Sequence, residues 1–168
     1  MMNVRFEQPG DIEKIRKVNL QAFETCAEAN LVDALRNTDV ELISLVAEEN
    51  GTVIGHILFS PVILGGGLRV MGLAPMAVLP DWQSKGVGAK LIKAGLQACE
   101  VAGYDAVVVL GHADYYPRFG FTPAVNFDIK SEYDVPPEVF MVKELRAGAL
   151  KDATGTVKYH PAFNEVTD

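Results

Sequence analysis

Gln83-Ser84-Lys85-Gly86-Val87-Gly88 is the stretch that decides the fold of this chain. It lies between an apolar, strand-like run, Met76-Ala77-Val78-Leu79, and an amphipathic pattern that predicts a helix over 86–102. The first turn of a helix leaves backbone N–H groups unpaired and carries the positive end of the helix dipole. Glycines at 86 and 88 let a ligand come close to the backbone. The stretch therefore predicts a phosphate-binding turn between a strand and a helix.

The expected helix joins two strands. The run AVVVL at 106–110 is continuously apolar, as is typical of a strand covered on both faces. A strand-helix-strand unit of this length predicts parallel strands with a right-handed crossover. The strand before the helix, 68–79, is interrupted by Gly72 and Pro75, where pairing is expected to stop. We therefore expect the two parallel strands to splay apart beyond this point, leaving unpaired backbone groups on the first of them.

The remaining elements are read from periodicity and turn residues. Asn50-Gly51 predicts a tight turn between antiparallel strands at 42–48 and 53–59. Asp11 is expected to cap the first helix. The other expected elements are a strand at 3–6, a helix at 28–36, a short helix at 113–119 ended by Gly120, strands at 121–129 and 139–145, and a strand around 156–159.

Length and composition indicate one domain and exclude several partners. The 168 residues are 49% hydrophobic with a mean hydropathy of +0.14, enough for a single core, so we predict one domain over 1–168 with 146–168 as its C-terminal extension. The net charge of -7 and the scattered Lys and Arg argue against nucleic acid. The sequence shows neither a basic leader nor a long apolar run, so we expect a cytoplasmic protein without a membrane partner and with Cys26 and Cys99 reduced.

Two familiar phosphate-binding motifs fail on spacing. A mononucleotide P-loop needs GxxxxGK followed by Ser or Thr, and a dinucleotide fingerprint needs GxGxxG. The pattern here is QxxGxG, followed downstream by Gly111-His112-Ala113-Asp114-Tyr115-Tyr116-Pro117-Arg118-Phe119-Gly120-Phe121. A mononucleotide binder therefore stays only a minor alternative.

The QxxGxG turn and the later tyrosine motif together resemble the GNAT superfamily of acetyl-CoA-dependent N-acetyltransferases. The GHxxYYPRFGF form is similar to the YhbS-like group of predicted acetyltransferases. The resemblance covers most of the chain and implies a mixed α/β (α+β) fold: a central, mostly antiparallel sheet with a splayed parallel strand pair, flanked by helices. It also implies transfer of the acetyl group from acetyl-CoA directly to an amine.

Carried over to this sequence, the resemblance implies a site for acetyl-CoA. Backbone N–H groups from Ser84 to Ala89 are implied to hold the pyrophosphate, with Gln83 at the entry of the turn. Strand residues near Ala77 are implied to pair with the pantetheine arm, and one of their N–H groups to stabilise the thioester oxyanion. The cofactor-binding residues expected are Met76, Ala77, Val78, Gln83, Ser84, Lys85, Gly86, Val87, Gly88 and Ala89. No metal is expected, because the histidines show no ligand spacing.

Tyr116 is implied to be the catalytic acid that protonates the leaving thiolate. A phenol has a pKa of about 10 and is ready to donate at neutral pH. The alternative is that Tyr116 only packs near the sheet. The base is open, because the broken strand carries no carboxylate; Glu24, Glu28, His56, His112 and water are the candidates.

Two classes of function follow from the sequence. The first is an N-acetyltransferase acting on a small-molecule or peptide amine. The second is a catalytically weak CoA-binding sensor or regulatory module, which the missing strand carboxylate favours and Tyr116 disfavours. The acceptor is expected at two acidic segments, 23–30 and 126–138, which tolerate a cationic amine without identifying it. The protein is expected to be a monomer or a homodimer, and acyl groups other than acetyl stay open.

Overall fold

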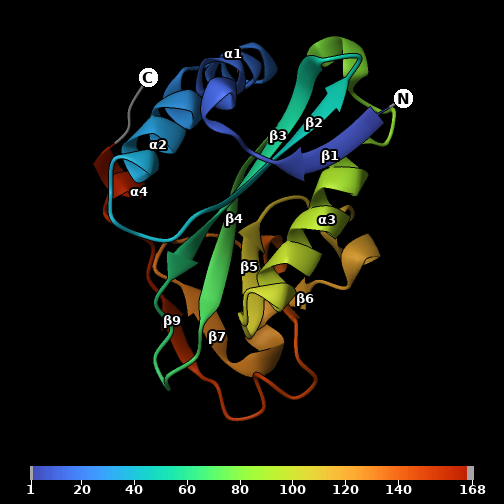
Figure 1. Ribbon diagram of the computed structural model, residues 1–168. Coiled ribbons are helices and arrows are strands. Elements are labelled where there is room, and N and C mark those ends of the chain that lie inside the picture. The colour runs from blue at the N-terminus through green and yellow to red at the C-terminus, as the bar shows by residue number, and fades with distance from the viewer. Residues whose placement is uncertain (1, 166–168) are drawn as a thin grey trace. The chain divides into compact units, whose positions relative to one another are not determined.

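The computed structural model describes residues 2–165. Figure 1 shows helices and strands mixed along the chain. The elements are β1 (Met2–Phe6), α1 (Ile12–Ala22), α2 (Ala27–Arg36), β2 (Ile43–Glu49), β3 (Thr52–Val62), β4 (Val70–Val78), α3 (Val87–Val101), β5 (Ala106–Leu110), β6 (Thr122–Pro123), β7 (Ile129–Ser131), β8 (Phe140–Glu144), β9 (Gly155–Val157) and α4 (Ala162–Glu165).

The chain divides into two compact units. The first comprises Met1–Ser60, Ala74–Gly95 and Pro161–Asp168, and the second comprises Pro61–Leu73 and Leu96–His160. Strands follow the order β1-β2-β3-β4 in the first unit and β4-β5-β8-β6 in the second. The long strands β3 and β4 each contribute residues to both units.

The first unit contains the predicted hairpin. Strands β2 and β3 are antiparallel, and their register ends with Glu49 opposite Thr52. The two residues between them, Asn50 and Gly51, have φ values of 52° and 81°. Positive φ at both positions is the conformation that twists a two-residue turn to match its strands. The turn predicted from the Asn-Gly pair is therefore confirmed.

Helices cover both faces of the sheet in the first unit. Leu58 packs in a core with Ile15 of α1 and Leu35 of α2. The next residue, Phe59, faces α3, where its ring leaves no room for a Cβ at Gly95. Successive residues of a strand point to opposite faces, so α1 and α2 lie on one face of β3 and α3 on the other.

Asp11 lies at the N-cap position of α1, as expected, but its side chain does not act as a cap. Helical structure begins earlier, with a 3-10 turn at Pro9–Asp11, and Asp11 makes no side-chain cap to α1. Its carboxylate instead accepts the N–H of Gln8 at 2.7 Å and pairs with Arg5 at 2.8 Å. These hydrogen bonds lower the pKa of Asp11, and the bond from the Arg5 guanidinium has the largest effect. Proline is favoured at the first position of a helix. The helical segment therefore begins at Pro9, before the apolar pattern that predicted α1.

The second unit contains the predicted parallel pair. Strand β4 lies parallel to β5 from Val70 opposite Ala106 to Leu73 opposite Val109, and β8 is antiparallel to β5. Strand β4 continues past this register to Val78. The fold class expected from the sequence, a mixed and mostly antiparallel sheet with one parallel pair and flanking helices, is confirmed.

The strand expected at 121–129 is wrong. Residues 122–123 form the short β6, Ala124–Phe127 form a 3-10 turn, and Asp128 takes the left-handed conformation with φ of 58°. Strand β7 then follows and pairs in parallel with β9. A proline and a left-handed residue divide an apolar stretch that reads as one strand in the sequence.

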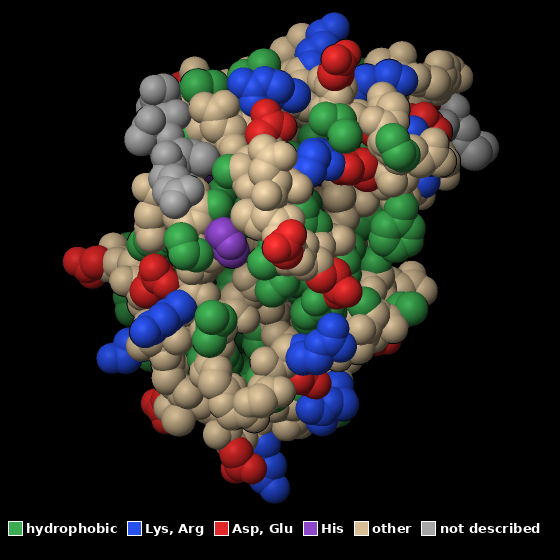
Figure 2. Space-filling model, turned by 60° about the vertical axis from the view of Figure 1, so that its left-hand side comes forward, with side chains coloured by type: hydrophobic (Ala, Val, Ile, Leu, Met, Phe, Trp, Pro, Cys, Tyr) green, Lys and Arg blue, Asp and Glu red, His purple; other side chains and the backbone are tan. Residues whose placement is uncertain are grey.

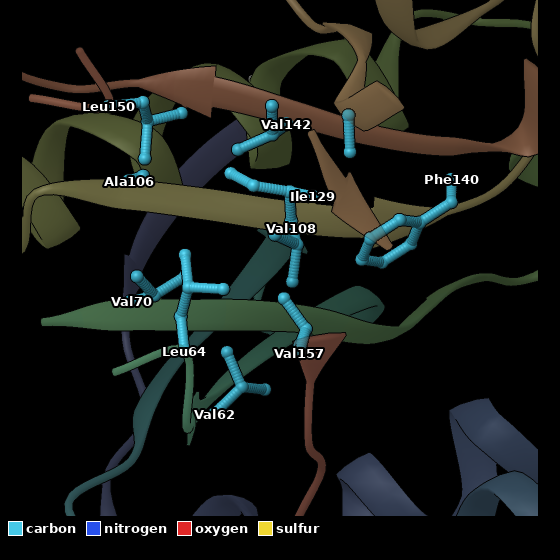
Figure 3. Close-up of a cluster of buried hydrophobic side chains, with 11 residues drawn as sticks. Val62, Leu64, Val70, Ala106, Val108, Ile129, Phe140, Val142, Leu150 and Val157 are labelled. Carbon is cyan, nitrogen blue, oxygen red and sulfur yellow. The ribbon is translucent and has the colours of Figure 1, made fainter. Parts of the chain in front are cut away.

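One hydrophobic core organises the second unit. Val70, Val108 and Val142 come from three neighbouring strands, and Ile129 and Val157 from β7 and β9. Figure 3 shows these side chains gathered at one place. Leu150 joins the same core, so the parts of the expected C-terminal extension around Leu150 and Val157 are packed against the fold.

Candidate functional site

The turn between β4 and α3 is anchored at both ends. Leu79 donates its N–H to the carbonyl of Ile54 on β3 at 2.9 Å. Pro80–Trp82 then form a 3-10 turn, closed by the Trp82 N–H on the Leu79 carbonyl at 2.8 Å. At the other end Val87 is buried. The exposed residues 83–86 are thus held between two fixed points.

Residues 84–86 form an exposed turn that presents backbone N–H groups. Ser84 and Gly86 have φ values of 63° and 85°. The N–H of Lys90 makes the first intrahelical bond, to the Gly86 carbonyl at 3.1 Å. The N–H groups of Val87, Gly88 and Ala89 therefore have no partner within the helix. This geometry, with the helix dipole behind it, is suited to binding an anion.

Gln83 ties this turn to the strand before it. Its side-chain Nε2 donates to the backbone carbonyl of Val78 at 3.0 Å. Val78 is thus joined to the turn by a direct hydrogen bond, and it is the last of Met76, Ala77 and Val78, the residues expected to contact the pantetheine arm. They lie beyond Leu73, where the parallel register with β5 ends. The ten expected cofactor-binding residues lie within 76–89, which runs from the end of β4 into the first turn of α3.

Lys85 adds a positive side chain to this turn. The Lys85 Nζ is 5.5 Å from the centre of the Trp82 ring, within reach of a cation–π contact. Lys85 is exposed and Trp82 is half-buried. An ammonium group held in this way adds positive charge beside the N–H groups of the turn.

Tyr116 belongs to the second unit. It opens a 3-10 turn, Tyr116–Phe119, and is 8% exposed. Its ring meets the rings of Tyr115 and Phe121 edge to face, at centroid distances of 5.2 and 5.7 Å. Burial raises the pKa of Tyr116 to about 12, and Tyr115 contributes in the same direction. The phenol is therefore protonated at neutral pH and able to donate.

Gly111 makes the room that Tyr116 occupies. A Cβ at position 111 would overlap the Tyr116 ring. The N–H of Gly111 donates to the carbonyl of Val139 at 3.0 Å, which fixes this backbone against the segment before β8. Sequence reasoning missed this positioning role, although a glycine directly after the apolar run 106–110 was a visible signal.

His56, one of the candidate bases, is fully buried in a polar chain of the first unit. Its Nδ1 lies 3.3 Å from Asn19 Nδ2, and its Nε2 lies 2.9 Å from Ser44 Oγ. Ser44 donates to Glu7 at 2.6 Å, and Glu7 pairs with Arg36. An amide N–H only donates, so Nδ1 is the acceptor and Nε2 carries the proton. Both nitrogens are thus engaged, which favours a structural role.

The other candidate bases differ in exposure. Glu24 and His112 are exposed. Glu28, in the first turn of α2, is half-buried, and within the described residues its buried Oε1 has no hydrogen-bond partner. Glu28 is therefore the candidate base with a carboxylate oxygen that is shielded from water and accepts no hydrogen bond from the described residues.

Three further observations concern surface charge, metal binding and membrane-spanning helices. On the face shown in Figure 2, Lys and Arg side chains are interspersed with Asp and Glu. No three His, Cys, Asp or Glu side chains within residues 2–165 are grouped so as to hold a metal ion. None of the helices in that same range is long and apolar enough to cross a membrane.

The turn, its helix and the parallel strand pair define a class of protein. Residues 41–123 match the family model described as an acetyltransferase (GNAT) domain. The full-length relatives below agree, so the chain belongs to the GNAT acetyltransferases. It is accordingly an N-acetyltransferase, in which acetyl-CoA is the donor and an amine is the acceptor.

Individual relatives are similar over most or nearly all of the chain. YhbS of Escherichia coli strain K12, named an uncharacterized N-acetyltransferase, is 38% identical over 165 residues, covering 97% of this chain and 99% of YhbS. YjhQ of the same strain, also named an uncharacterized N-acetyltransferase, is 39% identical over 134 residues, covering 76% of this chain and 74% of YjhQ.

Two solved structures support the same assignment. The crystal structure of E. coli YhbS in complex with CoA has a TM-score of 0.93 at 38% identity, covering 97% of this chain and 92% of that one. A GNAT acetyltransferase from Brucella melitensis in complex with acetyl-CoA has a TM-score of 0.80 at 38% identity, covering 97% and 98%. None of these relatives supports the alternative of a regulatory module.

The burial of His56 predicts an acid-sensitive stability. Burial, with Arg36 adding to it, lowers the pKa of His56 from 6.5 to about 3. The unfolded chain therefore binds a proton that the folded chain rejects, so this stability is present above pH 6.5 and is lost as the pH falls toward 3. We expect the free energy of unfolding to fall by up to about 1.4 kcal/mol per pH unit in this window.

Urea denaturation at pH 7 and pH 5 measures this effect. His56→Gln keeps a donor and an acceptor without a titrating ring, so its unfolding free energy should change less between the two pH values. Carboxylates with a lowered pKa, such as Asp11, lose their contribution mainly below pH 5, the lower of the two pH values. Equal pH dependence in both proteins would show that His56 does not carry the effect.

Proposed function

We propose that this chain binds acetyl-CoA through the turn before α3 and transfers the acetyl group to an amine with Tyr116 as the acid. The observation that carries the proposal is the exposed turn 83–86, with left-handed Ser84 and Gly86 in front of the unpaired N–H groups of α3. These N–H groups and Lys85 suit the pyrophosphate. The complexes of the two similar proteins with CoA and acetyl-CoA support the same donor.

In the proposed reaction the pantetheine arm lies along Met76, Ala77 and Val78. These residues of β4 come after Leu73, the last residue that pairs with β5. The amine nitrogen attacks the thioester carbonyl carbon, a C–N bond forms and the C–S bond breaks. A backbone N–H of this segment stabilises the oxyanion. The departing sulfur takes its proton from the Tyr116 hydroxyl, and the excess proton of the amine passes to a base.

Glu28 is the base we favour. Its Oε1 is buried, and the described residues supply it with no hydrogen-bond donor. His56, by contrast, has both ring nitrogens engaged. If Glu28 accepts the proton, Glu28→Gln should lower turnover more than Glu24→Gln, because Glu24 is exposed.

Two measurements test the proposal. Release of free CoA thiol from acetyl-CoA, followed with a panel of amines, should depend on both the donor and an amine. Thermal shifts should be larger with CoA than with ATP, because ligand binding raises apparent stability by mass action. CoA binding without turnover on any amine would favour a sensor module, and preference for ATP would favour a mononucleotide binder.

The location and assembly of the chain complete the proposal. We propose a cytoplasmic enzyme, in keeping with its two free cysteines. It acts as a monomer or a homodimer, which sedimentation equilibrium distinguishes. The single-domain organisation over 1–168 is also proposed, and cooperative unfolding in one transition tests it.

A further inference from the structure

The second unit contains a cavity of about 690 Å³ that the proposed donor site does not use. It lies over the segment that connects β6 to β8, and its wall includes residues of β7 together with Thr154. A volume of this size is in the range that holds a small organic ligand. The lining was only partly anticipated: the segment 126–138 was expected to contact the acceptor, but Val125, Phe140 and Thr154 lie outside it.

The cavity lining carries an excess of negative charge. Asp128, Glu132 and Asp134 contribute carboxylates, and Lys130 contributes the balancing ammonium group. Glu132 is partly used in the fold, because its Oε2 accepts the N–H of Tyr159 at 2.8 Å. These three carboxylates are exposed, and together they attract a cation to the cavity.

The carboxylate of Asp128 is not required for the local turn. The hydrogen bonds of this turn run through the Asp128 backbone: its N–H donates to Val125 at 3.0 Å, and its carbonyl accepts from Gly155 at 3.2 Å and from the Thr154 hydroxyl at 3.1 Å. Asn tolerates the left-handed conformation of this position as well as Asp does. The charge at Asp128 can therefore be removed while the turn is kept.

Most of the remaining lining is apolar or aromatic, and Ser131 and Thr154 add hydroxyl groups. Val125 is 54% exposed, and Tyr133, Val135 and Phe140 form further parts of the wall. An exposed valine costs free energy in water, which a ligand with its own apolar surface would recover. The lining thus suits a ligand that carries a cationic group on an apolar body.

Backbone pairing connects this wall to the residue against which Tyr116 packs. Phe140 is paired with Leu110 at the end of β5. The preceding residue, Val139, accepts the N–H of Gly111 at 3.0 Å, and Gly111 packs directly against the Tyr116 ring. The cavity and the proposed acid are therefore held by the same backbone, within one compact unit.

We propose that this cavity binds the amine acceptor, and that the acceptor is a small primary amine with an apolar or aromatic body, recognised as its ammonium ion by Asp128 and Asp134. The inference rests on the proposed acetyl transfer and adds the class of its substrate. The acceptor must lose a proton after binding, since only the neutral amine has the lone pair that attacks the thioester.

Binding of three matched probes tests the charge preference without catalysis. The probes are 2-phenylethylamine, 2-phenylethanol and 3-phenylpropanoate, which share a ring and differ in charge. Isothermal titration calorimetry with the full chain in the presence of CoA should show the amine binding at least about 5-fold more tightly than the alcohol, and the carboxylate most weakly. Equal affinity for the amine and the alcohol would overturn the proposal.

Variants then locate the binding to this cavity. Asp128→Asn combined with Asp134→Asn should weaken the amine about 10-fold, with little effect on the alcohol, since each exposed charge contributes about 0.5–1 kcal/mol. Lys130→Gln should strengthen the amine by about 2- to 3-fold. Asp152→Asn is the matched control, an exposed carboxylate of the same unit outside the cavity lining, and should change nothing.

Turnover separates this proposal from the proposed function. The double Asn variant should raise the KM for 2-phenylethylamine with little change in kcat. Acetyl transfer to amines that is indifferent to all cavity variants would overturn the cavity as the acceptor site while leaving the acetyltransferase function standing. Absence of transfer to every amine, with CoA still bound, would instead contradict the proposed function.

Discussion

Tyr116→Phe is expected to slow acetyl transfer by about 100-fold and to leave the affinity for CoA unchanged. The substitution removes one hydroxyl group, and a positioned general acid contributes about 10²- to 10⁴-fold. The ring contacts with Tyr115 and Phe121, and the space provided by Gly111, do not depend on that hydroxyl. The loss should therefore appear in kcat rather than in the folded structure.

The pH profile gives a second measurement of the same role. Burial disfavours the phenolate and raises the pKa of Tyr116 to about 12, so the acid stays protonated throughout the range in which the protein can be assayed. Tyr116 should therefore cause no loss of kcat on the alkaline side up to pH 10. A decrease in kcat on the alkaline side below pH 10 that disappears in Tyr116→Phe would show that the phenol has an ordinary pKa.

Tyr115→Phe is the matched control. The same atom is removed from the neighbouring residue, which is only half-buried and whose ring touches Tyr116 and Phe119. Its kcat should stay within about 3-fold of the wild type, since no proton transfer is assigned to it. Equal losses in the two variants would indicate that packing of the aromatic cluster, rather than an acid, limits turnover.

Local signals in the sequence were enough for several parts of this fold. Asn50-Gly51 specified the hairpin because only few residues adopt two consecutive positive φ values. The bounds of the strand at 106–110 were predicted to the residue. A strand covered on both faces is continuously apolar, so its ends are marked by the first and last apolar residues. The turn 83–86 was found from the spacing of its glycines and the amphipathic pattern that follows.

Features that depend on distant segments could not be predicted. The cavity wall needs β7 and β9 to pair, and these strands are connected only through β8 and the packed segment around Leu150. The buried position of His56 depends on Asn19 and Ser44, which lie on two other elements. Ser84 in a left-handed conformation was also missed, because a serine carries no local signal for positive φ.

Gly86→Val is expected to raise the KM for acetyl-CoA at least about 10-fold. Gly86 has φ of 85°, and no heavy atom lies within 4 Å of the place where its Cβ would be. A Cβ therefore meets no neighbour, and we expect the effect to come from the backbone. A branched residue in this region costs about 1–2 kcal/mol or more. The turn relieves this strain by moving, and movement turns the N–H groups of α3 away from a bound pyrophosphate.

Gly66→Val separates strain from ligand binding. Gly66 lies in the turn between β3 and β4, has a similar φ of 69° and is equally free of neighbours at its Cβ position. Both variants should lose a similar amount of unfolding free energy in urea, because the local conformational cost is the same. Only Gly86→Val should raise the KM for acetyl-CoA and weaken CoA in calorimetry. If both variants bind CoA as tightly as the wild type, the turn 83–86 does not hold the pyrophosphate. If both weaken it alike, the loss comes from general strain, because position 66 has no assigned part in the site.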